Sequence, residues 1–130
     1  MNREIKFRGK RVDNGKWIYG SLDVAYDGSM LISFWYSKLI EPENNYKEMV
    51  QEWHQVIPDS VGQFIGKIKT EQEVYEKDII LHGESVRFIE IRNGNTCATR
   101  GNKKETILLS FSENPSVIGN MIDNPELLIG

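Results

Sequence analysis

Short runs of β-forming residues, separated by turns rich in glycine and asparagine, constrain the fold of this chain more than any other feature. The turn signals are DNG at 13–15, YDGS at 26–29 and NG at 93–94. Asparagine and glycine tolerate the positive φ angles that tight hairpin turns need. Regularly spaced short strands of this kind are typical of barrels and packed antiparallel sheets. The pattern therefore predicts a mainly β fold, either a small barrel or compact antiparallel sheets, with α+β as the alternative.

Two further features bear on helices and on the number of domains. Residues 46–53, YKEMVQEW, place Tyr46, Met49 and Val50 on one side of a short helix. No strand candidate is followed by a long helical pattern, so we expect one or two short helices and no parallel α/β sheet. The chain has 130 residues, without an internal repeat or a long linker. This organisation predicts a single domain over residues 1–130.

Composition excludes several classes of protein. Charged residues make up 27% of the chain and hydrophobic residues 39%, which is typical of a globular protein and unlike a disordered one. No apolar run approaches the roughly 20 residues that span a bilayer, and the N-terminus lacks the apolar segment of a secretory signal. The single cysteine, Cys97, permits no internal disulfide. We expect a cytoplasmic protein that does not contact a membrane.

The motifs of common enzymes and metal sites are incomplete. GQFIGK, residues 62–67, superficially resembles a phosphate-binding loop, but three residues instead of four separate its glycines. Ile68 also replaces the hydroxyl residue that binds magnesium there, and we interpret the segment as a strand. His54, His82 and Cys97 lie far apart in sequence, without the spacing of a zinc site. The sequence predicts no catalytic residue, no metal ligand and no cofactor.

Cys97 is the one candidate thiol nucleophile, and no serine lies in a G-x-S-x-G turn. Arg100 is near enough in sequence to lower the pKa of the thiol. We nevertheless interpret Cys97 as a small buried or half-buried strand residue. Several carboxylates could serve either acid–base chemistry or a solvated surface: Glu73, Glu76, Asp78 and Glu84.

The N-terminal segment is the best candidate for binding. Residues 1–16 contain six basic and two acidic side chains, a formal charge of +4, in a chain whose net charge is −3. In EIKFRG, residues 4–9, apolar and basic residues alternate, which predicts a strand that buries Ile5 and Phe7 and has a basic outer face. The candidate contacts to nucleic acid, near Trp17 and Tyr19, are Lys6, Arg8, Lys10 and Arg11.

A simpler interpretation of the same basic strand is equally physical. Positive charge on an edge strand prevents edge-to-edge aggregation. Nucleic-acid-binding domains usually have a pI above about 9, whereas this chain is acidic overall. We therefore expect at most weak nucleic-acid binding.

The closing stretch VIGNMIDNPELL, residues 117–128, predicts a last strand followed by a capped turn. Gly119 allows close approach of another segment. Asn124 precedes Pro125, a residue favoured at the first helical position, and Glu126 suits the positive end of a helix. So short a turn cannot stand alone. We expect Leu127 and Leu128 to dock it, and we expect the tail to be structural and not a ligand loop.

Three stretches together resemble the YopX family of bacteriophage and prophage proteins: REIKFRGKRVDNGKWIYG at 3–20, VIPDSVGQFIGKIKTEQEVYEKDII at 56–80, and the closing VIGNMIDNPELL. The closing motif is the most specific, and residues 24–52 and 84–114 are not covered. Ile65 stands where the family often has threonine, and Lys77 where it usually has glycine. These departures bear on the geometry of the turns.

The resemblance implies a small phage or prophage protein in the bacterial host cytoplasm, without a settled biochemical function, and it transfers no catalytic residue. Three hypotheses follow. The first is a non-enzymatic accessory protein that binds a protein partner, with a homo-oligomer as one form. The second is a weak nucleic-acid-binding module that uses the basic strand. The third, ranked last, is an enzyme whose site is assembled from scattered carboxylates and histidines.

Overall fold

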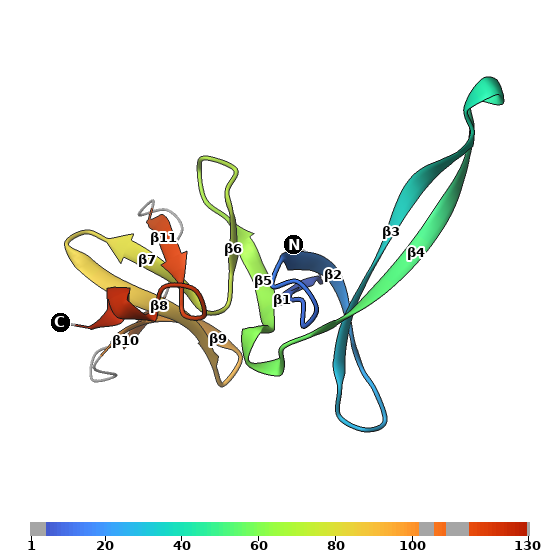
Figure 1. Cartoon of the computed structure of the whole chain (residues 1–130). Coiled ribbons are helices and arrows are strands. Elements are labelled where there is room, and N and C mark those ends of the chain that lie inside the picture. The colour runs from blue at the N-terminus through green and yellow to red at the C-terminus, as the bar shows by residue number, and fades with distance from the viewer. Residues whose placement is uncertain (1–4, 102–105, 109–114, 130) are drawn as a thin grey trace. The chain divides into compact units, whose positions relative to one another are not determined.

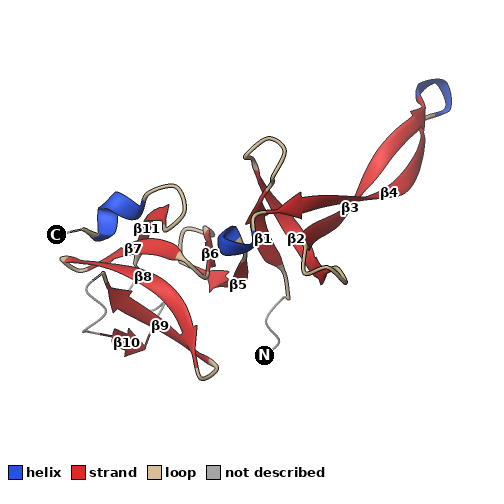
Figure 2. Ribbon diagram, turned by 60° about the horizontal axis from the view of Figure 1, so that its bottom comes forward, coloured by secondary structure: helices blue, strands red, loops and turns tan. Residues whose placement is uncertain are grey.

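The computed structural model describes residues 5–101, 106–108 and 115–129 (Figure 1). Of the described residues, 62% lie in strands and 9% in helical turns, and the strands form antiparallel sheets without a closed barrel. The mainly β prediction is therefore confirmed, in its form of antiparallel sheets. Strands dominate the ribbon, and the helical pieces are single short turns (Figure 2).

The chain divides into two compact units, Lys6–Val61 and Gly62–Gly130 with Met1–Ile5. We call them the N-terminal unit and the C-terminal unit and describe each by itself. That residues 1–130 act as one domain stays a prediction.

The N-terminal unit contains four antiparallel strands in the order β4-β3-β2-β1. They are β1 (Phe7–Lys10), β2 (Trp17–Val24), β3 (Met30–Glu41) and β4 (Tyr46–Val56), with the 3-10 turns η1 (Pro42–Asn44) and η2 (Pro58–Ser60). The predicted turns at 13–15 and 26–29 are confirmed, since Gly15 and Gly28 have φ angles of 70° and 91°. At the second turn the Asp27 carboxylate accepts a hydrogen bond from the backbone N–H of Ser29.

The helix predicted over residues 46–53 is wrong, because these residues belong to β4. Strand β4 pairs with β3 continuously from Met30↔Val56 to Leu39↔Lys47. Tyrosine, valine and tryptophan suit a strand at least as well as a helix, although Tyr46, Met49, Val50 and Trp53 recur at helical spacing. Pairing with a long neighbour therefore decides the structure here, not local propensity.

The orientation predicted for the N-terminal strand is also wrong at two positions. Strand β1 begins only at Phe7, and Ile5 is 77% exposed. Arg8 is 8% exposed instead of facing solvent. Its guanidinium carbon lies 4.8 Å from the centre of the Trp17 ring. A cation held over an indole face gains electrostatic attraction and buries its aliphatic stem, which explains why this arginine is covered.

The C-terminal unit holds a β5–β6 hairpin and a five-stranded antiparallel sheet in the order β10-β9-β8-β7-β11. Its elements are β5 (Gly62–Lys67), β6 (Glu73–Tyr75), β7 (Asp78–His82), β8 (Ser85–Arg92), β9 (Asn95–Arg100), β10 (Thr106–Leu108), β11 (Ser116–Asn120) and the 3-10 turn η4 (Pro125–Leu128). GQFIGK is indeed a strand, β5. The hairpin predicted at Asn93-Gly94 is confirmed, with φ angles of 51° and 80°.

Aliphatic side chains from five strands and from the β5–β6 turn form the core of this unit: Ile65, Ile68, Val74, Ile80, Ile89 and Ala98. Cys97 precedes Ala98 in β9 and is buried. This agrees with its interpretation as a small strand residue. Burying one isoleucine stabilises a fold by roughly 1.5–3 kcal/mol. The core therefore supplies the main driving force for this sheet.

The turn between β6 and β7 is fixed by buried hydrogen bonds. The Asp78 carboxylate is buried and accepts a 2.8 Å hydrogen bond from the backbone N–H of Tyr75. Lys77 has a φ of 75°. Its N–H donates to Ile89 O at 2.8 Å, and its carbonyl accepts from Met121 N at 2.9 Å. The backbone at position 77 is thus held in a left-handed conformation, which accounts for the family's usual glycine there.

Lys77→Gly is expected to raise the free energy of unfolding, by up to about 1 kcal/mol. A left-handed conformation costs an L residue about 1–2 kcal/mol, and the extra entropy of glycine in the unfolded chain offsets about 0.5–1 kcal/mol of the gain. Urea titration followed by circular dichroism measures the change. Lys69→Gly is the matched control, because Lys69 is exposed and does not have a positive φ. That variant is expected to lose stability, so a loss in both would contradict the strain at Lys77.

The closing motif forms a strand and a turn, as predicted. The Asn120 side-chain oxygen accepts hydrogen bonds from Ile122 N at 3.0 Å and Asp123 N at 2.8 Å. We had expected Asn124 to cap the turn, but its side chain makes no capping hydrogen bond to η4. Its side-chain oxygen instead accepts from Asn120 N at 3.2 Å. This bond lies close to Gly119, where a Cβ would approach that oxygen to 2.6 Å.

Candidate functional site

The β3–β4 hairpin contains a long two-stranded part. Strand β2 pairs with β3 only from Met30 to Ser33, whereas β4 pairs with β3 as far as Glu41↔Tyr46. Residues 34–41 and 46–52 are therefore two-stranded, and Trp53, opposite Ser33, lies at the base of this part. We call residues 34–41 and 46–53 the distal ribbon. Figure 1 shows β3 and β4 continuing well beyond the end of β2.

One face of the distal ribbon exposes four large apolar side chains. Directly paired residues share a face of the sheet, and so do alternate residues along a strand. The pairs Ser33↔Trp53 and Ser37↔Met49 therefore place the following residues on one face, which we call the apolar face: Trp35, Leu39, Met49 and Trp53. Their exposed fractions are 61%, 45%, 62% and 54%. Large apolar side chains are usually buried in a folded protein, so a group of exposed ones is informative.

On the opposite face of the hairpin, four side chains contact one another: Phe34, Tyr36, Glu52 and His54. The Phe34 ring stacks on His54, with centroids 6.0 Å apart. The Tyr36 hydroxyl donates to Glu52 at 3.1 Å, and His54 Nε2 lies 3.2 Å from the other Glu52 oxygen. The hydrogen bond with His54, and then the one from Tyr36, lowers the pKa of Glu52. The hydrogen bond to Glu52 raises the pKa of Tyr36. These groups form a closed network, in contrast to the apolar face.

Two of the four basic candidates, Arg8 and Lys10, lie near the same aromatic ring. Arg8 lies over the Trp17 ring, and Lys10 Nζ lies 6.0 Å from the centre of the same ring. Arg11 instead makes a two-point ion pair with Asp13, at 2.9 and 2.6 Å. That hydrogen bond raises the pKa of Arg11 and lowers the pKa of Asp13. The Trp17 ring thus contacts cations of its own chain. The fourth candidate, Lys6, is half-buried.

Tight nucleic-acid binding through the basic strand is not expected. Any binding should be non-specific, with Kd on the order of 10⁻⁴–10⁻⁶ M at physiological salt, and should weaken steeply as salt rises because counterion release drives it. Fluorescence anisotropy with labelled single- and double-stranded oligonucleotides across a salt series measures it. Lys6→Gln/Lys10→Gln tests the strand, and Lys38→Gln/Lys47→Gln, on the hairpin, is the control of equal charge. Nanomolar binding lost only in the first variant would contradict this expectation.

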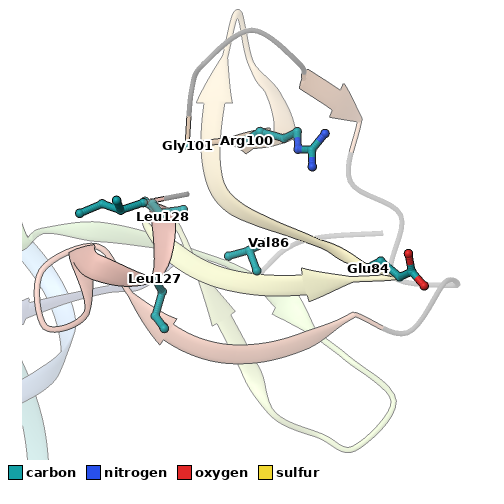
Figure 3. Close-up of a pocket in the computed structure, with 7 residues that line it drawn as sticks. Glu84, Val86, Arg100, Gly101, Leu127 and Leu128 are labelled. Carbon is teal, nitrogen blue, oxygen red and sulfur yellow. The ribbon is translucent and has the colours of Figure 1, made fainter.

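A cavity of about 390 Å³ lies where the C-terminal turn meets β8 and β9 (Figure 3). Its lining residues are Glu84, Val86, Arg100, Gly101, Leu127, Leu128 and Ile129. Leu128 is half-buried and its carbonyl lies against Gly101, where a Cβ would approach the oxygen to 2.1 Å. Leu127 is more exposed than its predicted docking role required. The cavity is therefore the space beside the C-terminal turn, lined by four aliphatic residues and a glycine, with one acidic and one basic residue.

The residues considered for metal binding or nucleophilic chemistry are not assembled into a site. In the part of the chain that the structure describes, no group of three or more histidine, cysteine or acidic side chains could hold a metal ion. His54 belongs to the network around Glu52, and Cys97 is buried in β9. That Cys97 has no catalytic role stays a prediction.

The sequence reasoning missed the apolar face. The signal was present in the sequence. Trp35 and Leu39 are separated by an even number of positions, as are Met49 and Trp53, so each pair shares a face if its segment is a strand. The assignment of a helix to residues 46–53 hid it, since a helix distributes these residues differently from a strand. A strand assignment would have placed Met49 and Trp53 on one face.

The comparisons with known proteins identify a family. Within the described residues, no helix has both the length and the hydropathy required to cross a membrane. No curated protein and no solved structure matches the chain. The model of the family described as YopX protein matches residues 6–129. This match covers nearly the whole chain, including the segments without a recognisable motif, and the chain therefore belongs to the YopX family.

Proposed function

We propose that this chain is a non-enzymatic protein-binding module and that the distal ribbon of its β3–β4 hairpin is the binding element. The observation that carries the proposal is the apolar face, where Trp35, Leu39, Met49 and Trp53 are all half or nearly half exposed. Contiguous exposed apolar patches mark interaction sites on soluble proteins. Tryptophan and methionine are also enriched in protein–protein interfaces.

The architecture of the ribbon supports the same function. A two-stranded hairpin is marginally stable in water, and a third strand or a packed face is needed for independent stability. The apolar face has neither among the residues described. Covering one tryptophan at the centre of an interface contributes about 2 kcal/mol or more to binding. The two tryptophans would therefore contribute a substantial part of the binding free energy of a complex.

The family resemblance supports an accessory role in a phage or prophage, in the cytoplasm of the bacterial host. The single buried cysteine is compatible with a reducing compartment. A nucleic-acid-binding module is a weaker proposal, because Arg8 is buried and Arg11 is paired with Asp13. The hypothesis of an enzyme is ranked last, since neither the cavity nor the Glu52 network contains a recognisable set of catalytic groups.

Site-specific photo-crosslinking in host cells tests the proposal. A photoreactive amino acid at Met49 is expected to form discrete adducts with protein, either another host or phage protein or a second copy. The same amino acid at Tyr26, which is fully exposed at the β2–β3 turn, is the control. The Met49 adducts should disappear in a Trp35→Thr/Trp53→Thr background, because threonine keeps strand propensity but removes the apolar contact.

Melting curves and circular dichroism establish that the double variant is folded. Equal adducts at Met49 and Tyr26 would contradict the proposal. So would an absence of any protein adduct at Met49.

A further inference from the structure

We propose that the partner of the distal ribbon is a second copy of this chain, bound by antiparallel pairing of β4 with the β4 strand of that copy. The inference rests on the proposed function and names the occupant of the same element. It would join two two-stranded ribbons into one four-stranded sheet, which has the strand number that independent stability requires.

The outer edge of β4 can be assigned from the hydrogen bonds at its end. The sheet order ends at β4. Gln55 O accepts a hydrogen bond from Val12 N at 3.0 Å, and Ile57 N donates to Lys10 O at 2.9 Å. Positions 55 and 57 thus direct their backbone groups away from β3. Successive residues of a strand direct these groups to opposite sides.

The same period of two continues towards the tip of the hairpin. The register between β3 and β4 has no irregularity from Val56 back to Lys47. Lys47, Met49, Gln51 and Trp53 therefore also direct N–H and C=O groups away from β3. No described strand pairs with them on that side. An uncovered edge of this length is a template for another strand, and β4 contains no proline that would block pairing.

When two copies of β4 pair about a twofold axis, one residue lies opposite itself and fixes the register. The side chains favour one of the few possible registers. An axis at Val50 would set Glu48 opposite Glu52 of the second copy, which places like charges together. An axis at Met49 would extend the pairing to Asn45, whose φ of 53° is not that of a strand. An axis at Gln51 avoids both problems. The structure therefore favours Gln51 opposite itself.

The register centred on Gln51 is complementary. It places Met49 opposite Trp53 of the second copy, where a thioether contacts an aromatic ring. It also places Glu48 opposite His54, an acidic group beside a basic one. The backbone groups at positions 49, 51 and 53 would form about six hydrogen bonds between the two copies. Pairing stops at Gln55, whose outward carbonyl already accepts from Val12 within its own chain.

Disulfide trapping tests both the partner and the register. In a Cys97→Ser background, Gln51→Cys is expected to oxidise rapidly to a covalent dimer. Facing residues of a hydrogen-bonded antiparallel pair have Cα atoms about 5.5 Å apart, which a disulfide can bridge. Gln55→Cys is the matched control, because it lies on the same strand and the same face but opposite Lys47 in this register. Its covalent dimer is expected to form much more slowly.

Light scattering after gel filtration gives an independent measurement. The wild-type chain, of 15.0 kDa, is expected to show twice that mass at high concentration. Met49→Pro removes an outward N–H without touching the bonds to β3, and it is expected to return the mass to that of one chain while circular dichroism stays native.

Four outcomes would overturn the inference. The first is a wild-type chain that is monomeric at every concentration, and the second is a Met49→Pro variant that is still dimeric. The third is a combination: Met49→Pro does not fold, and the Gln51→Cys disulfide does not form. The fourth is an equal rate of oxidation at positions 51 and 55. Adducts at Met49 with a different protein, in a chain that stays monomeric, would leave the proposed function standing and reject the second copy. Absence of any adduct at Met49 would reject both.

Discussion

A chain that lacks residues 124–130 is expected to melt about 5–10 °C below the full-length protein. The turn η4 docks through Leu128, which is half-buried, and its carbonyl lies directly against Gly101. The deletion also removes the Asn124 oxygen that accepts from Asn120 N and the Asn124 N–H that donates to Asn120 O at 2.8 Å. Burial of one leucine contributes roughly 1.5–3 kcal/mol, and 1 kcal/mol shifts the melting temperature of a chain this size by about 3–5 °C.

Two point variants separate the docking of the leucine from the loss of chain length. Leu128→Ala is expected to reproduce much of the shift, whereas Ile129→Ala is expected to leave the melting temperature unchanged, because Ile129 is exposed. Differential scanning calorimetry measures all three proteins. An unchanged melting curve for the deletion would mean that the tail is not structural.

The features that sequence predicted correctly are those set by a few neighbouring residues. The turns at 13–15, 26–29 and 93–94 depend on residues that accept a positive φ, and this requirement is local. The same is true of the turn in the closing motif, where Asn120 accepts hydrogen bonds from N–H groups two and three residues further on. Such signals can be recognised in a single sequence because the partner is almost adjacent.

The features that sequence missed depend on distant partners. Residues 46–53 become a strand because β3 offers a paired neighbour over its full length. Arg8 is buried because Trp17, nine residues away, presents a ring face across the hairpin. Alternation alone predicts which residues share a face, but not which face is covered. The apolar face of the hairpin was missed for the same reason, since its four residues come from two strands whose pairing had not been recognised.

Gly20→Ala is expected to destabilise the N-terminal unit by about 3 kcal/mol or more. Gly20 lies in β2, where a Cβ would approach Ser33 O to 2.0 Å and Ser33 C to 2.9 Å. The clash is with backbone, so no flexible side chain can move aside. Ser33 is buried and pairs with both Ser21 and Trp53, and shifting it would disturb two strand pairings. Overpacking a well-filled site typically costs about 1–3 kcal/mol, and more when the neighbour cannot relax.

Gly28→Ala is the control that separates this clash from the general cost of replacing glycine. Gly28 has a φ of 91° and no atom within 4 Å of its would-be Cβ, so its substitution carries only the backbone strain of about 1–2 kcal/mol. Urea unfolding followed by tryptophan fluorescence reports on this unit, because Trp17, Trp35 and Trp53 all lie within it. Gly20→Ala should shift the midpoint clearly further than Gly28→Ala. If the two shifts were equal, the close approach of β2 to β3 would not be a constraint on the sequence.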